Sequence, residues 1–334
     1  LLDENGKESA VFTGDSLFVG DVGRPDLREG AGNVKKSRKD LAAMMFDTLN
    51  NVFANLDDDV EVYPAHGPGS LCGKNMSPER WSTIGKEKKD NWAFQFDDKD
   101  KFISSFLEGQ PFIPQYFPYD VEVNRKGTTS LEEAIESVRI LDDSSQIPEG
   151  AVIVDARDEA SFKKGHVKGA FNIQLGEESS KFETWLGSII NPEEGYYLVT
   201  ADKDQMANAL RRVAKIGYET NLKGVTYVFK GELVADPQID LENFTNHPSE
   251  YTIVDIRNES ESKGDEIFEG ALNIPLAELR HRMSEIPKDK PIVVHCAGGY
   301  RSAAGASVIE ALASVRVLDL SEAINEFKEK SVEK

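Results

Sequence analysis

The hydrophobic and polar positions of the chain follow one pattern twice in its second half. Residues 150–173 and 250–274 each begin with a β-branched run that ends in Val-Asp-x-Arg, continue with a polar segment and close on Gly-Ala-x-Asn-Ile. A second apolar run follows each copy, at 196–200 and 291–295, and an amphipathic helical stretch comes next. Short apolar strands that alternate with helices are typical of a parallel sheet covered by helices. The pattern predicts two tandem α/β domains, at 127–237 and 238–334.

The first 95 residues follow a different pattern. A strand, a polar turn and a second strand open the chain, and apolar residues at near-helical spacing predict a helix over 39–55. Residues 96–126 include a passage with three prolines, which excludes a single helix or central strand there and predicts a connecting strap. Because the opening hairpin has no element before it, we expect an upstream segment that completes this first domain.

Composition excludes several classes of function. The net charge is −20, and a field of this sign repels nucleic acid and anionic lipid, so neither is expected as a partner. No apolar run reaches the roughly 18 residues of a membrane span, and no signal peptide is apparent. The two cysteines, Cys72 and Cys296, both lie in glycine-rich sequence, which favours free thiols in a reducing, cytoplasmic compartment over a disulfide.

The most informative segment lies between an apolar strand, 292–294, and a helix expected over 302–312. Cys296 stands at this strand-to-helix turn, where successive backbone N–H groups and the helix N-terminus attract negative charge. We expect its thiol to be largely ionised and Arg301 to add a cation for an anionic substrate. Ser302 is a usual cap residue. The residues of this loop that we expect to bind substrate are Ala297, Gly298, Gly299, Tyr300 and Ser302.

This segment resembles the active-site loop of the rhodanese family of sulfurtransferases, and the Val-Asp-x-Arg and Gly-Ala-x-Asn-Ile sequences resemble the upstream signature of that family. The resemblance implies that Cys296 accepts a sulfane sulfur as a persulfide. Related cysteine phosphatases have one more residue between Cys and Arg, so the spacing from Cys296 to Arg301 favours sulfur over phosphate.

The middle repeat retains the hydrophobic pattern but lacks the candidate catalytic residues. Aligning 198–200 with 293–295 puts Ala201 at the position of the cysteine, and acidic and amide residues replace the glycines and the arginine. We therefore interpret 127–237 as a catalytically inactive rhodanese-like domain. His166 fits the structural signature of the family and is not expected to be catalytic.

Two loops of the first domain carry further candidate residues. Asp15 and His66 each follow a predicted strand, and such positions suit metal ligands. Together with the sequences GDVGRPDL and SLCGK they resemble the C-terminal half of the metallo-β-lactamase superfamily, an αββα fold, and most closely its glyoxalase II-like branch that contains the persulfide dioxygenases. The resemblance implies that Asp15 is an iron ligand and that His66 lies beside the iron or binds a second metal. It also implies that Arg24 helps to hold the thiol substrate. Cys72 lies just after His66 and is a candidate for sulfur handling.

Taken together, the two resemblances imply a protein in which a metallo-β-lactamase domain is fused to an inactive and an active rhodanese domain. Its expected activity is the Fe(II)-dependent oxidation of a low-molecular-weight thiol persulfide to sulfite, coupled to sulfur transfer that involves thiosulfate or sulfite, in sulfide detoxification. All five histidines follow Asp15, at 66, 166, 247, 281 and 295, so the upstream histidines of the iron site would have to come from the missing segment. The alternatives are a glyoxalase II-like thioester hydrolase with two metals, often Zn, and a set of non-enzymatic regulatory domains. The carrier thiol and homo-oligomerisation are left open.

Overall fold

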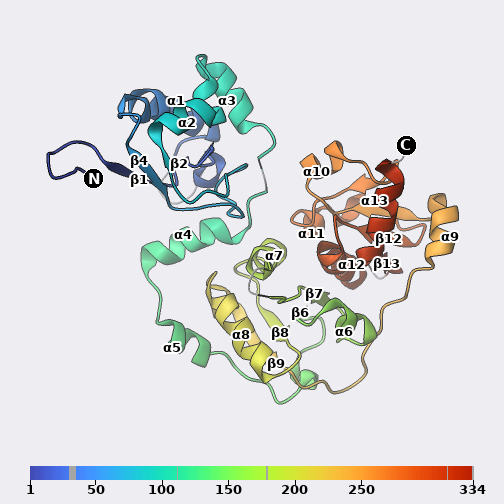
Figure 1. The fold of residues 1–334 in the computed structure, drawn as a ribbon. Helices are drawn as coiled ribbons and strands as arrows, with labels where there is room; N and C mark the ends of the chain where they lie inside the picture. The colour runs from blue at the N-terminus through green and yellow to red at the C-terminus, as the bar shows by residue number, and fades with distance from the viewer. Residues whose placement is uncertain (30–34, 111, 178–179, 314, 333–334) are drawn as a thin grey trace. The chain divides into compact units, whose positions relative to one another are not determined.

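The computed structural model describes residues 1–29, 35–110, 112–177, 180–313 and 315–332. The chain divides into two compact units, Leu1–Ile113 and Pro114–Lys334, which Figure 1 colours from blue to red along the chain. In the described residues no helix is both long and apolar enough to cross a membrane.

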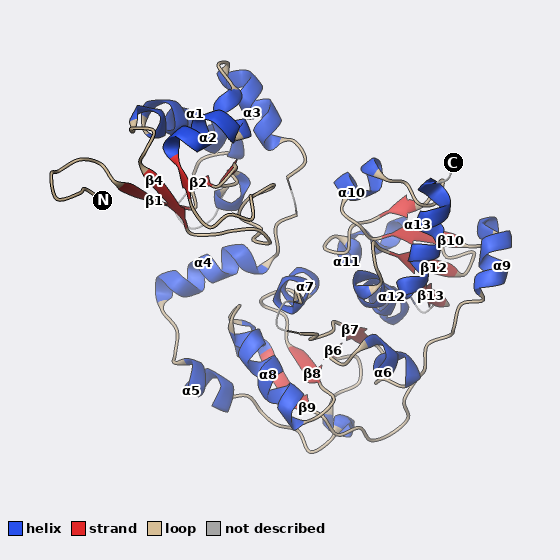
Figure 2. Ribbon diagram, viewed as in Figure 1, coloured by secondary structure: helices blue, strands red, loops and turns tan. Residues whose placement is uncertain are grey.

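The first unit joins a small mixed sheet to a helical layer (Figure 2). Its sheet has the strand order β1-β4-β5, with β1 and β4 parallel and β5 antiparallel to β4, while β2 and β3 form a separate hairpin. The elements are β1 (Ala10–Gly14), β2 (Leu17–Phe18), β3 (Asp21–Val22), α1 (Arg38–Asn51), β4 (Glu61–Pro64), β5 (Ser82–Thr83), α2 (Ile84–Asp90) and α3 (Lys99–Leu107).

The core of the first unit lies between the strands and α1 and α3. Leu49 of α1, Val62 of β4 and Phe102 of α3 are fully buried in one apolar cluster. The Trp92 ring stacks on Phe102, with 5.8 Å between the ring centroids. This packing fixes the ends of β1 and β4, where the two candidate loops of the sequence begin.

The second unit contains two four-stranded parallel sheets with the same topology. The first sheet has the order β7-β6-β8-β9 and the second β11-β10-β12-β13, with helices around both (Figure 2). The first domain's elements are α4 (Tyr116–Lys126), α5 (Leu131–Glu136), β6 (Val152–Asp155), α6 (Glu159–Lys164), β7 (Ala170–Asn172), α7 (Phe182–Ile189), β8 (Tyr196–Val199), α8 (Lys203–Ala214) and β9 (Leu222–Thr226). The second domain's are α9 (Leu241–Asn246), β10 (Thr252–Asp255), α10 (Glu259–Gly264), β11 (Leu272–Asn273), α11 (Leu279–Arg282), β12 (Ile292–His295), α12 (Tyr300–Ala313), β13 (Val317–Asp319) and α13 (Ile324–Val332).

The repeated sequence signature has a structural explanation. In each copy the Asp at the end of the first strand pairs with the Arg two residues later, as in Asp255 and Arg257, which are both buried and 2.7 Å apart. The Asn of Gly-Ala-x-Asn-Ile, Asn273 in the second copy, donates to the backbone carbonyls of these two residues. The first copy has the same bonds. The signature therefore ties the ends of neighbouring parallel strands together.

Two predicted elements differ from the structure. The strap at 96–126 contains two helices, α3 and α4. Helix α4 accommodates Pro118 because this residue falls in the first turn, where a helix needs no N–H donor. The helix that follows Cys296, α12, begins at Tyr300 instead of Ser302. Ser302 is therefore not a cap: its hydroxyl lies in the first turn and donates to the Gly299 carbonyl at 2.7 Å.

Candidate active sites

Cys296 lies directly between β12 and α12, as the sequence predicts. Its side chain is buried, and its Sγ accepts a hydrogen bond from the Gly299 N–H at 3.1 Å. The loop thus curls back on the sulfur, so that a backbone dipole and the N-terminus of α12 act on one atom. This arrangement stabilises negative charge on Cys296 or on a sulfur bound to it.

The loop conformation depends on Gly299 rather than on both glycines. Gly299 has a φ of +107°, and a Cβ at this position would lie 3.2 Å from the Ser321 carbonyl carbon and the Glu322 nitrogen. Gly298 has no positive φ, and a Cβ there would meet nothing within 4 Å. A side chain at Gly299 would therefore strain the turn and push against the following loop.

Arg301 is held by a partner that the sequence did not indicate. Both of its terminal nitrogens donate to the Glu261 carboxylate on α10, at 2.8 Å each. These bonds hold the pKa of Glu261 below its ordinary value. The expected cation for an anionic substrate is thus already paired, and an incoming anion competes with Glu261 for the guanidinium. No sequence signal joins these residues, which are 40 positions apart, and Glu261 also fits the capping box of α10.

The middle domain supplies part of the wall beside Arg301. The Trp185 ring of α7 lies with its centroid 6.0 Å from the Arg301 guanidinium carbon. The Tyr300 hydroxyl donates to the Gln174 carbonyl at 2.6 Å. On the other side of the loop, the Lys328 ammonium of α13 donates to the Ala297 carbonyl. The sequence repeat did not indicate that the inactive domain and the last helix both contact the active loop.

His295, which precedes the cysteine, is completely buried beside Phe268 and Asp255. Burial lowers the pKa of His295 to about 4, so the ring is neutral at physiological pH. Its Nδ1 is 4.0 Å from the nearest Asp255 oxygen, and neither ring nitrogen has a hydrogen-bond partner among the described residues. His295 is thus an uncharged neighbour of the nucleophile.

Strand register corrects the sequence alignment of the middle domain. Asp155 pairs with Val199, whereas Asp255 pairs with His295. Val199 therefore corresponds to His295, and Thr200 stands at the position of the cysteine, in place of the Ala201 that the sequence alignment put there. The alignment was wrong by one residue because both apolar runs end in a similar way.

The loop of the middle domain that corresponds to the Cys296 loop is also shorter, and one of its backbone amides is already hydrogen-bonded. Helix α8 begins three residues after Thr200, whereas α12 begins four residues after Cys296. The Ala201 N–H donates to the Gln205 side chain at 2.6 Å, so a loop amide that could face a substrate is already bonded. His166 is buried and stacks on Phe162, as expected for a structural residue.

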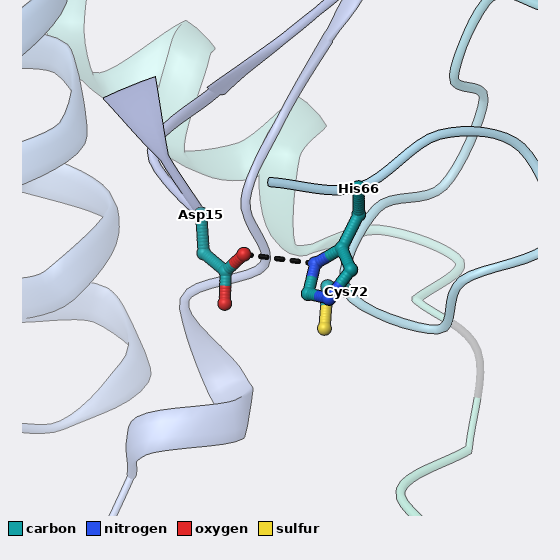
Figure 3. Close-up of side chains that lie close together, drawn as sticks. All are labelled: Asp15, His66 and Cys72. Carbon is teal, nitrogen blue, oxygen red and sulfur yellow. Dashed lines mark ion pairs between the residues drawn. The ribbon is translucent and has the colours of Figure 1, made fainter. Parts of the chain in front are cut away.

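The structure also places Asp15, His66 and Cys72 close to one another. The Asp15 Oδ1 is 2.8 Å from the His66 Nδ1 (Figure 3). One potential ligand atom from each of Asp15, His66 and Cys72 lies within 4.8 Å of the others. Burial raises the pKa of the Cys72 thiol. The sequence singled out Cys72 only for sulfur handling, and its place among the potential metal ligands is a structural finding.

Arg24 has a different setting from the one that the resemblance implied. Its side chain is buried and forms a bidentate pair with Asp26, with N–O distances of 3.1 and 2.7 Å. It also donates to the Leu71 carbonyl at 3.1 Å, while its backbone N–H donates to the Cys72 carbonyl at 2.9 Å. Direct substrate binding by Arg24 would have to displace these bonds. Its visible effect is to hold the Cys72 loop against the Gly-Arg-Pro-Asp loop.

A cavity of about 310 Å³ adjoins this cluster. Its polar lining includes Asp15, Ser16 and Cys72, and its apolar lining comes mainly from α1. The exposed Arg28 also lines the cavity. The volume lies at the small end of the roughly 300–1,000 Å³ typical of ligand pockets, so it suits a small molecule or one end of a larger one.

A metal ion implied by the fold is compatible with the Asp15 and His66 side chains. Ligands of one ion at about 2.0–2.2 Å lie roughly 3 Å apart, close to the observed 2.8 Å. Carboxylate and imidazole are both suitable ligands for iron or zinc, whereas a thiol favours zinc among these choices. The donor set therefore fits a metal without fixing which one.

Three comparisons with known proteins agree with this description. The profile of the rhodanese-like domain matches residues 137–231 and 240–330, together more than half of the chain. The solved structure of a metallo-β-lactamase from Staphylococcus aureus is similar, with 26% identity and a TM-score of 0.53 over 67% of this chain and 59% of that chain. These findings confirm the predicted fold class, mixed α/β with a metallo-β-lactamase-like part and rhodanese-like domains.

Shorter matches exist to two curated proteins. YqhL of Bacillus subtilis is 39% identical over 57 residues, which are 17% of this chain and 44% of YqhL. The HTH-type transcriptional regulator Rv0324 of Mycobacterium tuberculosis is 45% identical over 51 residues, which are 15% of this chain and 22% of Rv0324. The chain thus spans less than half the length of either curated relative. Because the family model matches residues 137–231 and 240–330 in tandem, the chain belongs to the rhodanese-like domain family.

Proposed function

We propose that the C-terminal domain is a sulfurtransferase that carries sulfur as a persulfide on Cys296. The observation that carries the proposal is the hydrogen bond from the Gly299 N–H to Sγ, in a loop that ends at a helix N-terminus. Family membership, and the occurrence of thiosulfate as a substrate of sulfurtransferases, make thiosulfate the first donor to test.

The chemistry is two successive displacements at sulfur. The Cys296 thiolate attacks the sulfane sulfur of thiosulfate, the S–S bond of thiosulfate breaks, and sulfite leaves with the bonding electron pair. The terminal sulfur of the new persulfide carries the negative charge, which the loop N–H groups stabilise. An acceptor thiolate or cyanide then attacks that sulfur, and Cys296 leaves as the thiolate, so the enzyme returns to its starting state.

A variant of the nucleophile tests the proposal. Cys296→Ser should abolish thiosulfate-dependent sulfur transfer and leave folding intact, because Ser is nearly isosteric but is not ionised at neutral pH. Cys72→Ser is the matched control and should keep the transfer activity. Substantial transfer by Cys296→Ser would show that another group carries the sulfur.

We propose a second function for the first unit, the oxidation of a thiol persulfide to sulfite. The observation that favours it is the Asp15–His66–Cys72 cluster beside a cavity, together with the likeness to a metallo-β-lactamase. A bound Fe(II) would supply activation of O2. In the overall balance the persulfide, O2 and water give free thiol, sulfite and two protons, with O2 as the four-electron oxidant and water as the source of the third oxygen.

The roles of this chain's residues follow from their positions. Asp15 and His66 would hold the metal, Arg24 would position the Cys72 loop, and Cys72 would contact the sulfur end of the substrate. The upstream histidines that the resemblance calls for are not among residues 1–334. The oxidation proposal therefore applies to a protein in which those ligands are present. In the proposed metabolism of sulfide, sulfite from the first unit and sulfane sulfur on Cys296 would be interconverted with thiosulfate.

Metal content separates this proposal from its alternative. A protein that contains all the ligands should bind about one iron and consume O2 with a thiol persulfide. A glyoxalase II-like thioester hydrolase would instead bind two metals, often zinc, and use water as the nucleophile. Two equivalents of zinc and thioester hydrolysis without O2 consumption would overturn the oxidation proposal.

A further inference from the structure

A lysine of the inactive domain reaches the buried end of the last strand of the active domain. Lys163 on α6 donates to the Asp319 carboxylate, with 2.8 Å between Nζ and Oδ2, and it also pairs with Glu159 on its own helix. The Asp319 side chain is only 3% exposed at the end of β13. A carboxylate buried this deeply needs a cation beside it, because little water is present to solvate its charge. Among the residues that the structure describes, Lys163 is the cation that pairs with it.

Asp319 also holds the turn that follows β13. Its Oδ1 accepts a hydrogen bond from the Ser321 N–H at 2.9 Å. Ser321 has a φ of +50° and is the one non-glycine residue with a positive φ in the described part of the chain. Serine rarely adopts this backbone conformation, so surrounding contacts have to hold it there. The Asp319 carboxylate, two residues earlier, supplies one of those contacts.

The Ser321 turn lies directly against the loop that contains the nucleophile. A Cβ at Gly299 would lie 3.2 Å from the Ser321 carbonyl carbon and 3.2 Å from the Glu322 nitrogen, so the two backbones are in close contact. The Gly299 N–H is also the group that donates to the Cys296 Sγ. A displacement of the turn would therefore reach the donor of this hydrogen bond.

We propose that Lys163 of the inactive domain is a positioning residue for sulfur transfer by Cys296. It anchors the Asp319 carboxylate and, through it, the Ser321 turn. That turn supports Gly299, whose N–H binds the sulfur. Donors aimed at a developing charge lose much of their effect when they move, so the anchor affects the rate without touching the reacting atoms. The inference rests on the proposed transfer at Cys296, and it gives a domain without a nucleophile a part in that reaction.

Lys163→Met removes the ammonium and keeps a side chain of similar length. In steady-state transfer from thiosulfate to cyanide by the full chain, we expect kcat to fall about tenfold, since a displaced donor costs less than the 10²–10³ of a deleted one. The KM for thiosulfate should change little, because Arg301 keeps its contacts. Lys163→Arg retains a cation within reach of Asp319 and should restore most of kcat. Lys164→Met, at an exposed position on the same helix, is the matched control and should behave like the unsubstituted protein.

A double variant separates the effect of charge from that of packing. Lys163→Met combined with Asp319→Asn leaves no unpaired carboxylate at this contact, and the amide oxygen can still accept the Ser321 N–H. The double variant should regain most of the kcat that Lys163→Met loses. A merely structural contact would instead lower the melting temperature of Lys163→Met and leave the kcat of the folded protein unchanged, which would refute the positioning role.

Amide hydrogen exchange of the full chain tests the route of contacts without any turnover. Lys163→Met should speed exchange at least about threefold in the peptides that contain Gly299 and Ser321, whereas Lys164→Met should not. Unchanged exchange in both peptides would overturn the inference whatever happens to kcat. If the unsubstituted protein transfers no sulfur, the proposed function fails, and faster exchange in Lys163→Met would still establish the route from the inactive domain to the loop.

Discussion

The Arg301–Glu261 ion pair predicts the direction in which a change at Glu261 alters the KM for thiosulfate. The two groups share two hydrogen bonds of 2.8 Å, and their side chains are 16% and 35% exposed. Two unit charges about 4 Å apart interact by about 4 kcal/mol at an effective dielectric constant of 20, but partial exposure reduces the net worth of such a pair to roughly 1 kcal/mol. An anionic donor has to overcome that attraction to reach Arg301.

Glu261→Gln removes the competing charge and keeps the shape of the side chain. We expect the KM for thiosulfate to fall about fivefold, the equivalent of roughly 1 kcal/mol, with little change in kcat, because the carboxylate does not touch the reacting sulfur. Steady-state sulfur transfer to cyanide at low ionic strength measures both constants. Glu259→Gln on the same helix is the matched control, since Glu259 forms an ion pair with the exposed Lys263 and, among the described residues, with no other side chain.

The result that would refute this reasoning is a rise in KM. In that case Glu261 would serve mainly to orient Arg301, and its loss would resemble the loss of Arg301 itself. Arg301→Gln should raise the KM for thiosulfate and lower kcat/KM in either case, so it provides the reference for the comparison.

Three further predictions concern other parts of the chain. Asp15→Ala should lower the metal content, measured by elemental analysis, and spare sulfur transfer by the C-terminal domain; unchanged metal content would exclude Asp15 as a ligand. Thr200→Cys should not create sulfur uptake in the middle domain, because the loop is one residue shorter and Gln205 holds an amide; a mass gain of one sulfur on that cysteine would contradict this. Burial, with Asp236 nearby, raises the pKa of Glu310 to about 7 from its ordinary 4.5, so the folded state holds the extra proton and stability falls as pH rises through this window. Glu310→Gln should therefore stabilise the protein at pH 8 by roughly 1–2 kcal/mol, discounted for solvent exposure, and not at pH 4; equal effects in melts at both pH values would contradict the assignment.

The sequence predicted the parts of the fold that depend on local pattern. The β-branched runs and the Gly-Ala-x-Asn-Ile segments identified both parallel sheets, because strands buried on two faces are apolar throughout. The position of Cys296 also followed from the sequence, since a strand, a glycine turn and a helix succeed one another within about ten residues.

The parts that sequence did not predict depend on contacts between distant segments. Glu261, Trp185 and Lys328 come from three different helices and reach the active loop only in the folded chain. The register of Thr200 depends on pairing with β6, which an alignment of two short apolar runs cannot resolve. The contacts of Arg24 likewise depend on which backbone carbonyls, such as that of Leu71, lie beside its guanidinium in the folded chain.

The central claim, that this protein carries sulfane sulfur on Cys296, is tested most directly by mass spectrometry of the chain after brief exposure to thiosulfate and removal of the excess. The account predicts a mass gain of one sulfur atom on the peptide that contains Cys296, lost again on addition of cyanide and absent from Cys296→Ser. No gain on that peptide, or a gain that appears on Cys72 instead, would contradict it.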